Sequence, residues 1–600
     1  MRKNIINTII KIVLIAIAPV GLTIMLLAFA DNSPVSPVTY LMICLAYIIF
    51  IFRKKTKNVS GAFSYIATGI FSLLFAFSLM LKKHIVYSGE IFGKLNVNYF
   101  VDVTFKDVLF AVLLSVMIFV LAIHIIDLII ILLGRLNEKV PKTHQLNGIK
   151  WSVLIFLGFV IVWGLGYLAF WPGTSMWNDI DAILVNGPIG ESFRSPVFYN
   201  LITYFFLVVI CNPVTDPNTG FAIYALCQLL FMAAVVTYVM WWAYAVVKIR
   251  TPLLVALFIF FAFYPMVGLY SFTVVKDVPF SLFMFLWLPV LYDAAREKKL
   301  CMRNKVLFCI AAVGTLIFRN NGKIILPLLV IVAFIFVKNN RKFIAAAGLS
   351  VLIVLTLISS LLTRNVPYRF AEGTGPLLQQ IAMVLSKDGD VSEEDREFLY
   401  QIKEEEYWTG TDANSYAPMC VDSLKMADDA IAINSYVIND DFLNEHRAEF
   451  IMTYLRVLAR NPSLCIEAWL MESYGFWAFG TWGVTQSYIT GLNTTYYDYE
   501  MSPMLPGSLY ETVQEYFMNS EVCYGSAGTF IWIILFIALL LILAKKSRYL
   551  IVLLPMIFNW LVILFLTPIA FGMRYVFYYF LIVPVVLALI PEIVEDKRMP

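Results

Sequence analysis

The sequence contains few charged residues. Asp, Glu, Lys and Arg make up only 14% of its 600 residues, whereas soluble domains contain about 25%. Hydrophobic residues make up 60% of the chain and its mean hydropathy is +0.80, which excludes a soluble globular protein. The net charge is only +3 and no basic run is dense enough for a nucleic-acid-binding arm, so no nucleic-acid partner is expected.

Cysteine and histidine are also scarce. The eight cysteines are scattered with no Cys-x-x-Cys spacing, and the four histidines do not cluster. Neither a zinc site nor a disulfide framework is therefore indicated. Chemistry in this chain must depend on where its few charged and polar residues lie.

Long apolar runs dominate the chain instead. A helix crosses the hydrocarbon core of a bilayer with roughly 20 residues. Fourteen runs are predicted to span on this basis, at residues 9–29, 38–53, 61–82, 107–134, 150–171, 219–247, 252–272, 277–295, 304–320, 323–338, 341–363, 528–544, 549–570 and 573–591.

The basic clusters between these runs predict the topology. They are Arg53 to Lys55, Arg135 to Lys150, Lys248 to Arg250, Arg296 to Lys305, Lys338 to Lys342, Lys545 to Arg548 and Lys597-Arg598. Cytoplasmic loops are enriched in Lys and Arg, and these clusters share one side only if the apolar run 196–211 does not span. We therefore expect 196–211 to be a juxtamembrane or half-inserted helix on the outer face, with both termini cytoplasmic. Lys82 and Lys83 lie outside in this scheme, against the bias.

The expected fold is an all-α polytopic membrane protein with about 14 transmembrane helices and one mainly helical extracytoplasmic domain. Its predicted parts are a four-helix membrane extension at 1–149, a membrane module at 150–363 whose first external loop is 172–218, an acidic external domain at 364–527, and a three-helix membrane segment at 528–600. The external domain holds 25 Asp and Glu against 9 Lys and Arg. In it, Ser392 before Glu393-Glu394-Asp395 predicts a capped helix. The aromatic residues from Trp469 to Trp482 fit either a helix on the membrane surface or a domain core.

The loop after the fifth span concentrates polar groups. Pro172 and Gly173 end that span, and a polar stretch follows that includes Asp179 and Asp181. The two carboxylates are candidate catalytic residues, and the alternative is that they belong to a solvated loop or helix cap. In a helix they would point to different faces, so only one is expected to act.

Three further polar motifs are predicted on the same outer face. They are Lys276-Asp277, the run Arg319-Asn320-Asn321-Gly322-Lys323, and Arg574-Tyr575. Basic residues are scarce on this side, and an anionic ligand would explain them, because arginine binds phosphate as a fork and lysine as a point charge. A neighbouring carboxylate suits a general base or a divalent cation such as Mg²⁺ or Mn²⁺. The alternatives are a helix start at Lys276-Asp277, a polar turn at 319–323 and an interface anchor at Arg574-Tyr575.

These motifs carry a family resemblance. The segments concerned are Trp171-Pro172-Gly173-Thr174, Ser195-Pro196-Val197-Phe198-Tyr199, Val275-Lys276-Asp277-Val278, Phe318-Arg319-Asn320-Asn321-Gly322, Leu377-Leu378-Gln379-Gln380-Ile381-Ala382 and Arg574-Tyr575. In this order the chain resembles, over residues 150–591, an uncharacterised family of multi-pass membrane proteins from Gram-positive bacteria. That family in turn resembles the GT-C glycosyltransferases, such as protein mannosyltransferases and lipid A aminoarabinose transferases.

The resemblance implies a GT-C-like helical bundle in a bacterial cell membrane, with juxtamembrane helices such as the one expected at 196–211. Its partners would be a polyprenyl-phosphate-linked sugar and a glycan or protein acceptor of the cell envelope. Asp179 would be the base for the acceptor hydroxyl, with Asp181 as substitute, and Asp277 resembles an acid that helps to hold a metal in some members. The implied substrate-binding residues are Arg194, Lys276, Arg319, Asn320, Asn321, Lys323, Arg574 and Tyr575. The chain departs from the family pattern at Asn178, where the loop acid is expected, and at Arg194-Ser195, where relatives often have His.

A transporter or flippase for a lipid-linked sugar or another anionic lipid is the alternative function. Transporters usually place ionisable residues near the bilayer midplane and often contain repeats. Here the polar motifs are predicted at helix ends and no repeat is apparent, which favours the enzyme. A third possibility is an inactive scaffold that displays the acidic domain.

Overall fold

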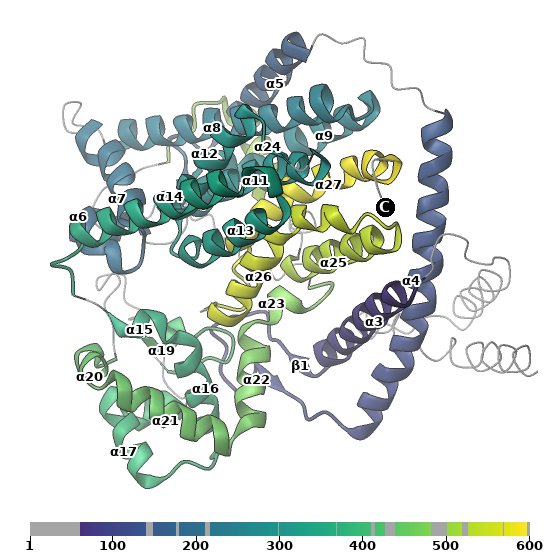
Figure 1. The fold of residues 1–600 in the computed structure, drawn as a ribbon. Coiled ribbons are helices and arrows are strands. Elements are labelled where there is room, and N and C mark those ends of the chain that lie inside the picture. The colour runs from purple at the N-terminus through teal and green to yellow at the C-terminus, as the bar shows by residue number, and fades with distance from the viewer. Residues whose placement is uncertain are drawn as a thin grey trace, which may run out of the picture.

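The structure is a computed structural model, and it describes residues 61–139, 148–175, 179–210, 217–297, 299–367, 369–409, 415–425, 438–481, 501–518, 526–567 and 569–596. These residues form a large helical bundle with a smaller helical domain packed against one end of it (Figure 1). The first two predicted spans, 9–29 and 38–53, lie outside the described residues.

The bundle contains the helices expected from the apolar runs. They are α3 (Ala62–Lys83), α4 (Phe105–Lys139), α5 (Gly148–Ala169), α8 (Pro217–Trp241), α9 (Thr251–Phe263), α10 (Pro265–Ser271), α11 (Asp277–Glu297), α12 (Met302–Phe318), α13 (Gly322–Phe336), α14 (Arg341–Leu362), α25 (Ala527–Leu543), α26 (Leu554–Leu566) and α27 (Tyr578–Glu595). Most of their bounds lie close to those of the predicted runs. The run 252–272, however, is divided at Pro265 into α9 and α10, and the run 549–570 begins as a 3-10 segment, Ser547–Val552, before α26.

Seven helices in the described part of the chain are long and apolar enough to cross a membrane, and the pair α9 and α10, bent by 62°, makes an eighth if it counts as one span. The protein is therefore a predominantly α-helical membrane protein. Helices α13, α25 and α26 are apolar but shorter, with 15, 17 and 13 residues. The run at 196–211 is also short: α7 (Val197–Tyr204) continues as a π-helical turn to Ile210, and these residues would extend only about 21 Å.

Two helices form the centre of the bundle. In α11, 94% of the most apolar 18 residues are buried, and in Met573–Glu595, the segment that contains α27, the share is 89%. In α14 the same share is only 11%. Helices α11 and α27 pack against each other, so their ends are fixed from all sides. Asp277, the first residue of α11, and Arg574, in the turn just before α27, are consequently held in place.

A short parallel pairing joins two distant segments. Strand β3 (Thr174–Ser175) pairs with β4 (Thr273–Val274), and the hydroxyls of Thr174 and Thr273 lie 2.8 Å apart. Gly173 before β3 has a φ of +131°, and a Cβ there would lie 2.8 Å from the Cβ of Ala225, so the tight turn requires glycine. The pairing places the loop after α5 beside the start of α11.

The N-terminal helices α3 and α4 pack against each other at the side of the bundle (Figure 1). The loop between them carries β1 (Ile85–Val86) and β2 (Tyr99–Phe100), which pair antiparallel. Lys82 donates to the carbonyl of Gly480 at 2.9 Å, and Lys94 donates to that of Ser415 at 2.9 Å. Lys82, which runs against the charge bias, thus joins α3 to the segment after α23, and Lys94 joins the loop between α3 and α4 to the domain.

The domain contains α15 (Phe370–Gly373), α16 (Gly375–Ser386), α17 (Glu393–Ile402), α18 (Glu405–Thr409), α19 (Asp422–Lys425), α20 (Asp440–Glu445), α21 (Arg447–Arg460) and α22 (Pro462–Glu472). The predicted capped helix is confirmed as α17, since the Ser392 hydroxyl accepts from the Asp395 amide. This small unit packs under the bundle (Figure 1).

The later part of region 364–527 belongs to the bundle rather than to this unit. Helix α23 (Tyr474–Trp477) is buried and packs on α25 and α26. The indole N–H groups of Trp532 and Trp560 donate at 2.8 Å to the carbonyls of Trp477 and Phe476, respectively. Helix α24 (Gly507–Met518) packs on α5 and α10. The described residues of the aromatic stretch pack against bundle helices rather than in a core of the small domain, with Trp469 and Phe479 half-buried, and Trp482 lies outside the described residues.

Candidate functional site

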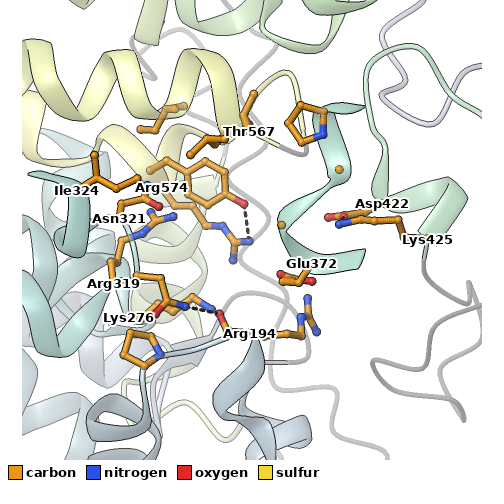
Figure 2. A pocket seen from close by; sticks show the side chains of 18 of the residues that line it. Arg194, Lys276, Arg319, Asn321, Ile324, Glu372, Asp422, Lys425, Thr567 and Arg574 are labelled. Carbon is orange, nitrogen blue, oxygen red and sulfur yellow. Dashed lines mark hydrogen bonds and ion pairs between the residues drawn. The ribbon is translucent and has the colours of Figure 1, made fainter. Parts of the chain in front are cut away.

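A cavity of about 400 Å³ lies where the domain meets the bundle. Its lining comes from loops and helix ends far apart in the sequence, namely Arg194, Pro196, Lys276, Arg319, Asn320, Asn321, Ile324, Arg369, Glu372, Gly373, Gly375, Pro376, Asp422, Lys425, Ile563, Leu566, Thr567, Arg574 and Tyr575. Figure 2 shows Arg319, Lys276 and Arg574 facing Glu372, Asp422 and Lys425 across it. Two of the predicted outer-face motifs, the 319–321 segment and Arg574-Tyr575, meet here, together with Lys276 from the third.

Asp277 anchors the bundle wall of the cavity. Its carboxylate is fully buried at the first residue of α11, forms an ion pair with the guanidinium of Arg319, and lies 3.9 Å from Nε of Arg574. The ring of Tyr575 faces both guanidinium groups, at 4.5 Å from the Cζ of Arg319 and 5.0 Å from that of Arg574. One carboxylate and one aromatic ring therefore fix two cations at the cavity wall.

The loop before α7 is tied to the same wall. The ammonium of Lys276 donates to the Ser195 hydroxyl at 2.6 Å, and the Asn320 amide donates to the carbonyl of Arg194 at 3.5 Å. Arg194 is thereby placed at the edge of the cavity next to the 319–321 segment. Ser195 thus has a structural role as the partner of Lys276.

The turn between α12 and α13 presents Arg319 and the two asparagines. Its sharpness depends on Gly322, where an added Cβ would lie 1.9 Å from the carbonyl oxygen of Thr315. The backbone of α13 can therefore approach α12 only if this residue has no side chain. Arg319 itself has extended backbone angles, φ −145° and ψ 141°, which direct the chain out of α12.

The opposite wall comes from the domain. Its loop reaches the bundle through two backbone contacts: Cys420 forms an isolated bridge with Ile569, and the amide of Ala570 donates to the carbonyl of Met419 at 2.9 Å. Ile569 and Ala570 lead into the turn that carries Arg574. This docking places α19, with Asp422 and Lys425, across the cavity from the arginines.

Lys425 is a buried cation on that wall. Its side chain is only 2% exposed, and its Nζ lies 3.0 Å from the Asp422 carboxylate. Burial opposes the charged form, but Asp422 and then Glu372 outweigh it and raise the pKa of Lys425, which stays protonated at neutral pH. Near it, burial raises the pKa of Glu472 well above its usual value, although the charge of Lys425 opposes the shift.

Cations predominate in the cavity. The described lining residues include six basic side chains, Arg194, Lys276, Arg319, Arg369, Lys425 and Arg574, and two acidic ones, Glu372 and Asp422. Asp277 behind the wall offsets one more positive charge. The cavity therefore attracts an anionic ligand.

The two candidate catalytic residues follow β3 in the sequence. Helix α6 (Asp179–Gly190) begins at Asp179, four residues beyond the end of β3. Because β3 and β4 run in the same direction, the chain leaves both strands at the same end, where Lys276 and Asp277 follow β4. The side chains of Asp179 and Asp181, and residues 176–178, lie outside the part that the structure describes.

Lys323 lies in a small pocket beside the main cavity rather than in it. This pocket of about 90 Å³ shares Pro196 and Asn320 with the cavity and reaches Ser359 of α14.

A metal is not suited to Asp277 as its surroundings stand, because guanidinium groups already face its carboxylate. The described residues contain no group of three or more His, Cys, Asp or Glu side chains that could hold a metal ion. No step proposed below passes through a metal.

Four charged residues of the site were missed by sequence reasoning: Arg369, Glu372, Asp422 and Lys425. All of them belong to the domain, and the hydropathy of the sequence does not predict how the domain packs on the bundle. The scarcity of basic residues in region 364–527, 9 against 25 acidic ones, is the one signal that could have drawn attention to Arg369 and Lys425.

Comparison with known families gives one match. The family of unknown function DUF6020 matches residues 196–597, about two thirds of the chain, so the chain belongs to this family. Neither a curated protein nor a solved structure was found to match. The matched segment contains every described residue of the cavity wall except Arg194.

Proposed function

We propose that this member of the DUF6020 family is a membrane glycosyltransferase of the GT-C type. It would transfer a sugar from a polyprenyl-phosphate carrier to a cell-envelope acceptor at the outer membrane face. The observation that carries this proposal is the cavity in which Lys276, Arg319 and Arg574, from three separate motifs, face one space. An anionic lipid headgroup at a bundle end is the ligand that best matches such an arrangement.

The proposed topology has fourteen spans, cytoplasmic termini and an extracytoplasmic domain. It is supported by the separation of basic residues between the two ends of the bundle. Arg250, Arg303 and Arg548, all from clusters assigned to the cytoplasm, form ion pairs with Glu592, Asp293 and Asp596 near the ends of α27 and α11 that lie away from the cavity. The cavity would then open at the outer face.

In the proposed reaction the bundle wall holds the phosphate of the carrier. The guanidinium groups of Arg319 and Arg574 and the ammonium of Lys276 would donate to its oxygens. Negative charge grows on this phosphate as its bond to the sugar breaks, so cations fixed beforehand by Asp277 and Tyr575 stabilise the transition state more than the ground state.

The acceptor hydroxyl needs a base, and Asp179 is proposed for it with Asp181 as substitute. The acceptor oxygen forms a bond to C1 of the sugar while the bond from C1 to the phosphate oxygen breaks. The hydroxyl proton passes to the carboxylate, and the bonding electron pair stays on the departing phosphate. One base and one cationic clamp are enough for such an inverting transfer.

The transporter alternative receives less support from the position of the charges. The cavity cations lie at helix ends next to a domain, whereas transport pathways usually place ionisable residues near the midplane. The experiment below separates the two functions.

The test uses the full chain in proteoliposomes with polyprenyl-phosphate hexoses labelled in the sugar and an isolated envelope fraction as acceptor. Transfer of label is expected for the wild type and a loss of at least about 100-fold for Asp179→Asn with Asp181→Asn. Arg460→Gln, which changes an exposed arginine of α21 outside the cavity lining, serves as control.

Full transfer by the double Asn variant would remove the base assignment. Movement of intact labelled lipid between leaflets, with no transfer for any hexose, would instead establish the transporter.

A further inference from the structure

The cationic cavity has two separate ends. The bundle end consists of Lys276, Arg319 and Arg574 with Asp277 behind them. The domain end consists of Arg369 and Lys425 with the carboxylates of Glu372 and Asp422, and Arg194, from the loop before α7, lies at the edge of the cavity beside them. Figure 2 shows Arg319 and Lys425 on opposite sides of the space. A single phosphate held by the bundle end would leave the domain end unused.

Three cations and two carboxylates line this part of the cavity, and Asp440 behind the lining acts on Arg369. Arg194 is close enough to Lys425 to oppose its protonation. Like charges brought together around a space are costly without a ligand. The carboxylates of Asp422 and Glu372 lower that cost in the empty cavity, and an anion entering between Arg194 and Lys425 would lower it further.

A helix end points to the same place. Gly375 and Pro376, the first two residues of α16, line the cavity, and an added Cβ on Gly375 would lie 3.5 Å from Nζ of Lys425. The Thr374 hydroxyl does not cap this helix; it donates back to the carbonyls of Phe370 and Ala371. The positive end of the helix dipole and a buried ammonium therefore coincide.

The charge of the domain residues that line the cavity differs from the charge of the region around them. Region 364–527 is strongly acidic, with 25 acidic residues against 9 basic ones, yet it contributes two of its few basic residues to the cavity. Packing of the domain against the bundle does not by itself require two basic side chains at the cavity.

We propose that the domain end is a second phosphate subsite, so that the occupied cavity holds two phosphate groups. This inference rests on the proposed function, in which the bundle end holds the carrier phosphate. The second phosphate has two chemical sources: the lipid-attached phosphate of a diphosphate-linked carrier, whose sugar-bonded phosphate lies at the bundle end, or a phosphate on the acceptor. Arg369 and Arg194 would bind it as forks, and Lys425 would supply a fixed charge.

The test measures binding by the purified full chain in nanodiscs. The probes are farnesyl phosphate, farnesyl diphosphate and glycerol 3-phosphate, and the variants are Arg369→Gln and, independently, Arg194→Gln. If the second phosphate comes from the carrier, the diphosphate binds at least about tenfold tighter than the monophosphate, and either variant removes the difference. If it comes from the acceptor, glycerol 3-phosphate binds together with farnesyl phosphate, and either variant abolishes its binding.

Arg460→Gln, with the same charge change on the exposed surface of the domain, should behave as wild type throughout. The proposal is overturned if the wild type shows neither diphosphate preference nor glycerol 3-phosphate binding, or if Arg369→Gln and Arg194→Gln match Arg460→Gln. Failure of farnesyl phosphate to bind, with glycerol 3-phosphate still bound through Arg369, would instead remove the proposed function and leave the subsite standing.

Discussion

The two ends of the helical bundle use charge in different ways. At the end away from the cavity, Arg250 lies 3.1 Å from Glu592 and 3.6 Å from Glu595, and Arg548 is paired with Asp596. At the cavity end, six basic side chains and two acidic ones line one space. Charges balanced pair by pair stabilise the structure, whereas an excess of one sign around a cavity points to a ligand of the opposite sign.

This contrast also separates two roles for a buried carboxylate. Asp293 accepts from Trp242, Arg303 and Asn304, a set of partners that fixes α11 and α12 to each other. Asp277, at the other end of α11, holds two arginines that face the cavity. The same residue type thus serves packing at one end of a helix and presents cations for binding at the other.

The largest effect on stability is expected at the end of the bundle away from the cavity, where the charges form ion pairs; we call it the balanced end. Arg250→Gln would leave Glu592 buried without its cation, and breaking one partner of a buried pair costs about 3–5 kcal/mol. The melting temperature in detergent should fall sharply, and adding Glu592→Gln should restore part of it. Binding of farnesyl phosphate per folded molecule should be unchanged. A melting temperature equal to that of the wild type would contradict the distinction between the two ends.

The next effect concerns ligand binding at the cavity end. Arg319→Gln or Arg574→Gln should weaken farnesyl phosphate binding by about 10- to 100-fold, because each removes a charged hydrogen-bond donor. Arg303→Gln, which removes a cation of the balanced end, should leave the affinity of folded protein unchanged. Equal affinities for all three variants and the wild type would show that the excess charge does not bind the headgroup.

A smaller change in stability should come from the backbone that presents Arg319. In Gly322→Ala the new Cβ would press on the carbonyl of Thr315, and such overpacking costs about 1–3 kcal/mol. Gly164→Ala in α5, where a Cβ meets nothing within 4 Å, is the matched control and should melt at or slightly above the wild-type temperature. A wild-type melting temperature for Gly322→Ala would mean that the turn is not as tight as described.

The smallest effect should come from Lys403, a buried domain lysine whose ammonium donates to the carbonyl of Leu424 at 2.8 Å. Burial lowers the pKa of Lys403 from 10.5 to about 8. Between these values the unfolded chain binds more protons, so stability should rise with pH from 8 to 10.5. Melting curves of the wild type and Lys403→Met should show this rise only in the wild type. A parallel pH dependence in both would exclude Lys403 as its cause.

Much of the bundle could be predicted from local sequence. Helix α11 was expected at 277–295 and is observed at Asp277–Glu297, since Asp277 begins it and charges end it. Arg319 and Arg574 could be placed on one face because the positive-inside rule relates loops that are distant in sequence. Their convergence on one carboxylate required the packing of α11 against α27, which hydropathy does not encode.

The domain wall could not be predicted in this way. Its position depends on single contacts, such as the bridge between Cys420 and Ile569 and the hydrogen bond from Lys94 to Ser415. Lys82 is a second example of a contact that the sequence pattern does not predict. Its position runs against the charge bias, and its ammonium donates to the carbonyl of Gly480. Long-range pairings between isolated polar groups have no periodicity that a sequence pattern could show.

The pairing of β3 with β4 bears on how the protein is made. Thr174 and Thr273 are 99 residues apart, so during synthesis the loop after α5 lacks its partner strand until the ribosome has translated the following helices. Nascent chains stopped before residue 273 should expose this loop to added protease, and chains long enough to insert α11 should protect it. The pairing with β4 would thus be an early step, because the cavity wall is complete only after the 319–321 turn, the domain and the turn that carries Arg574 have also been made.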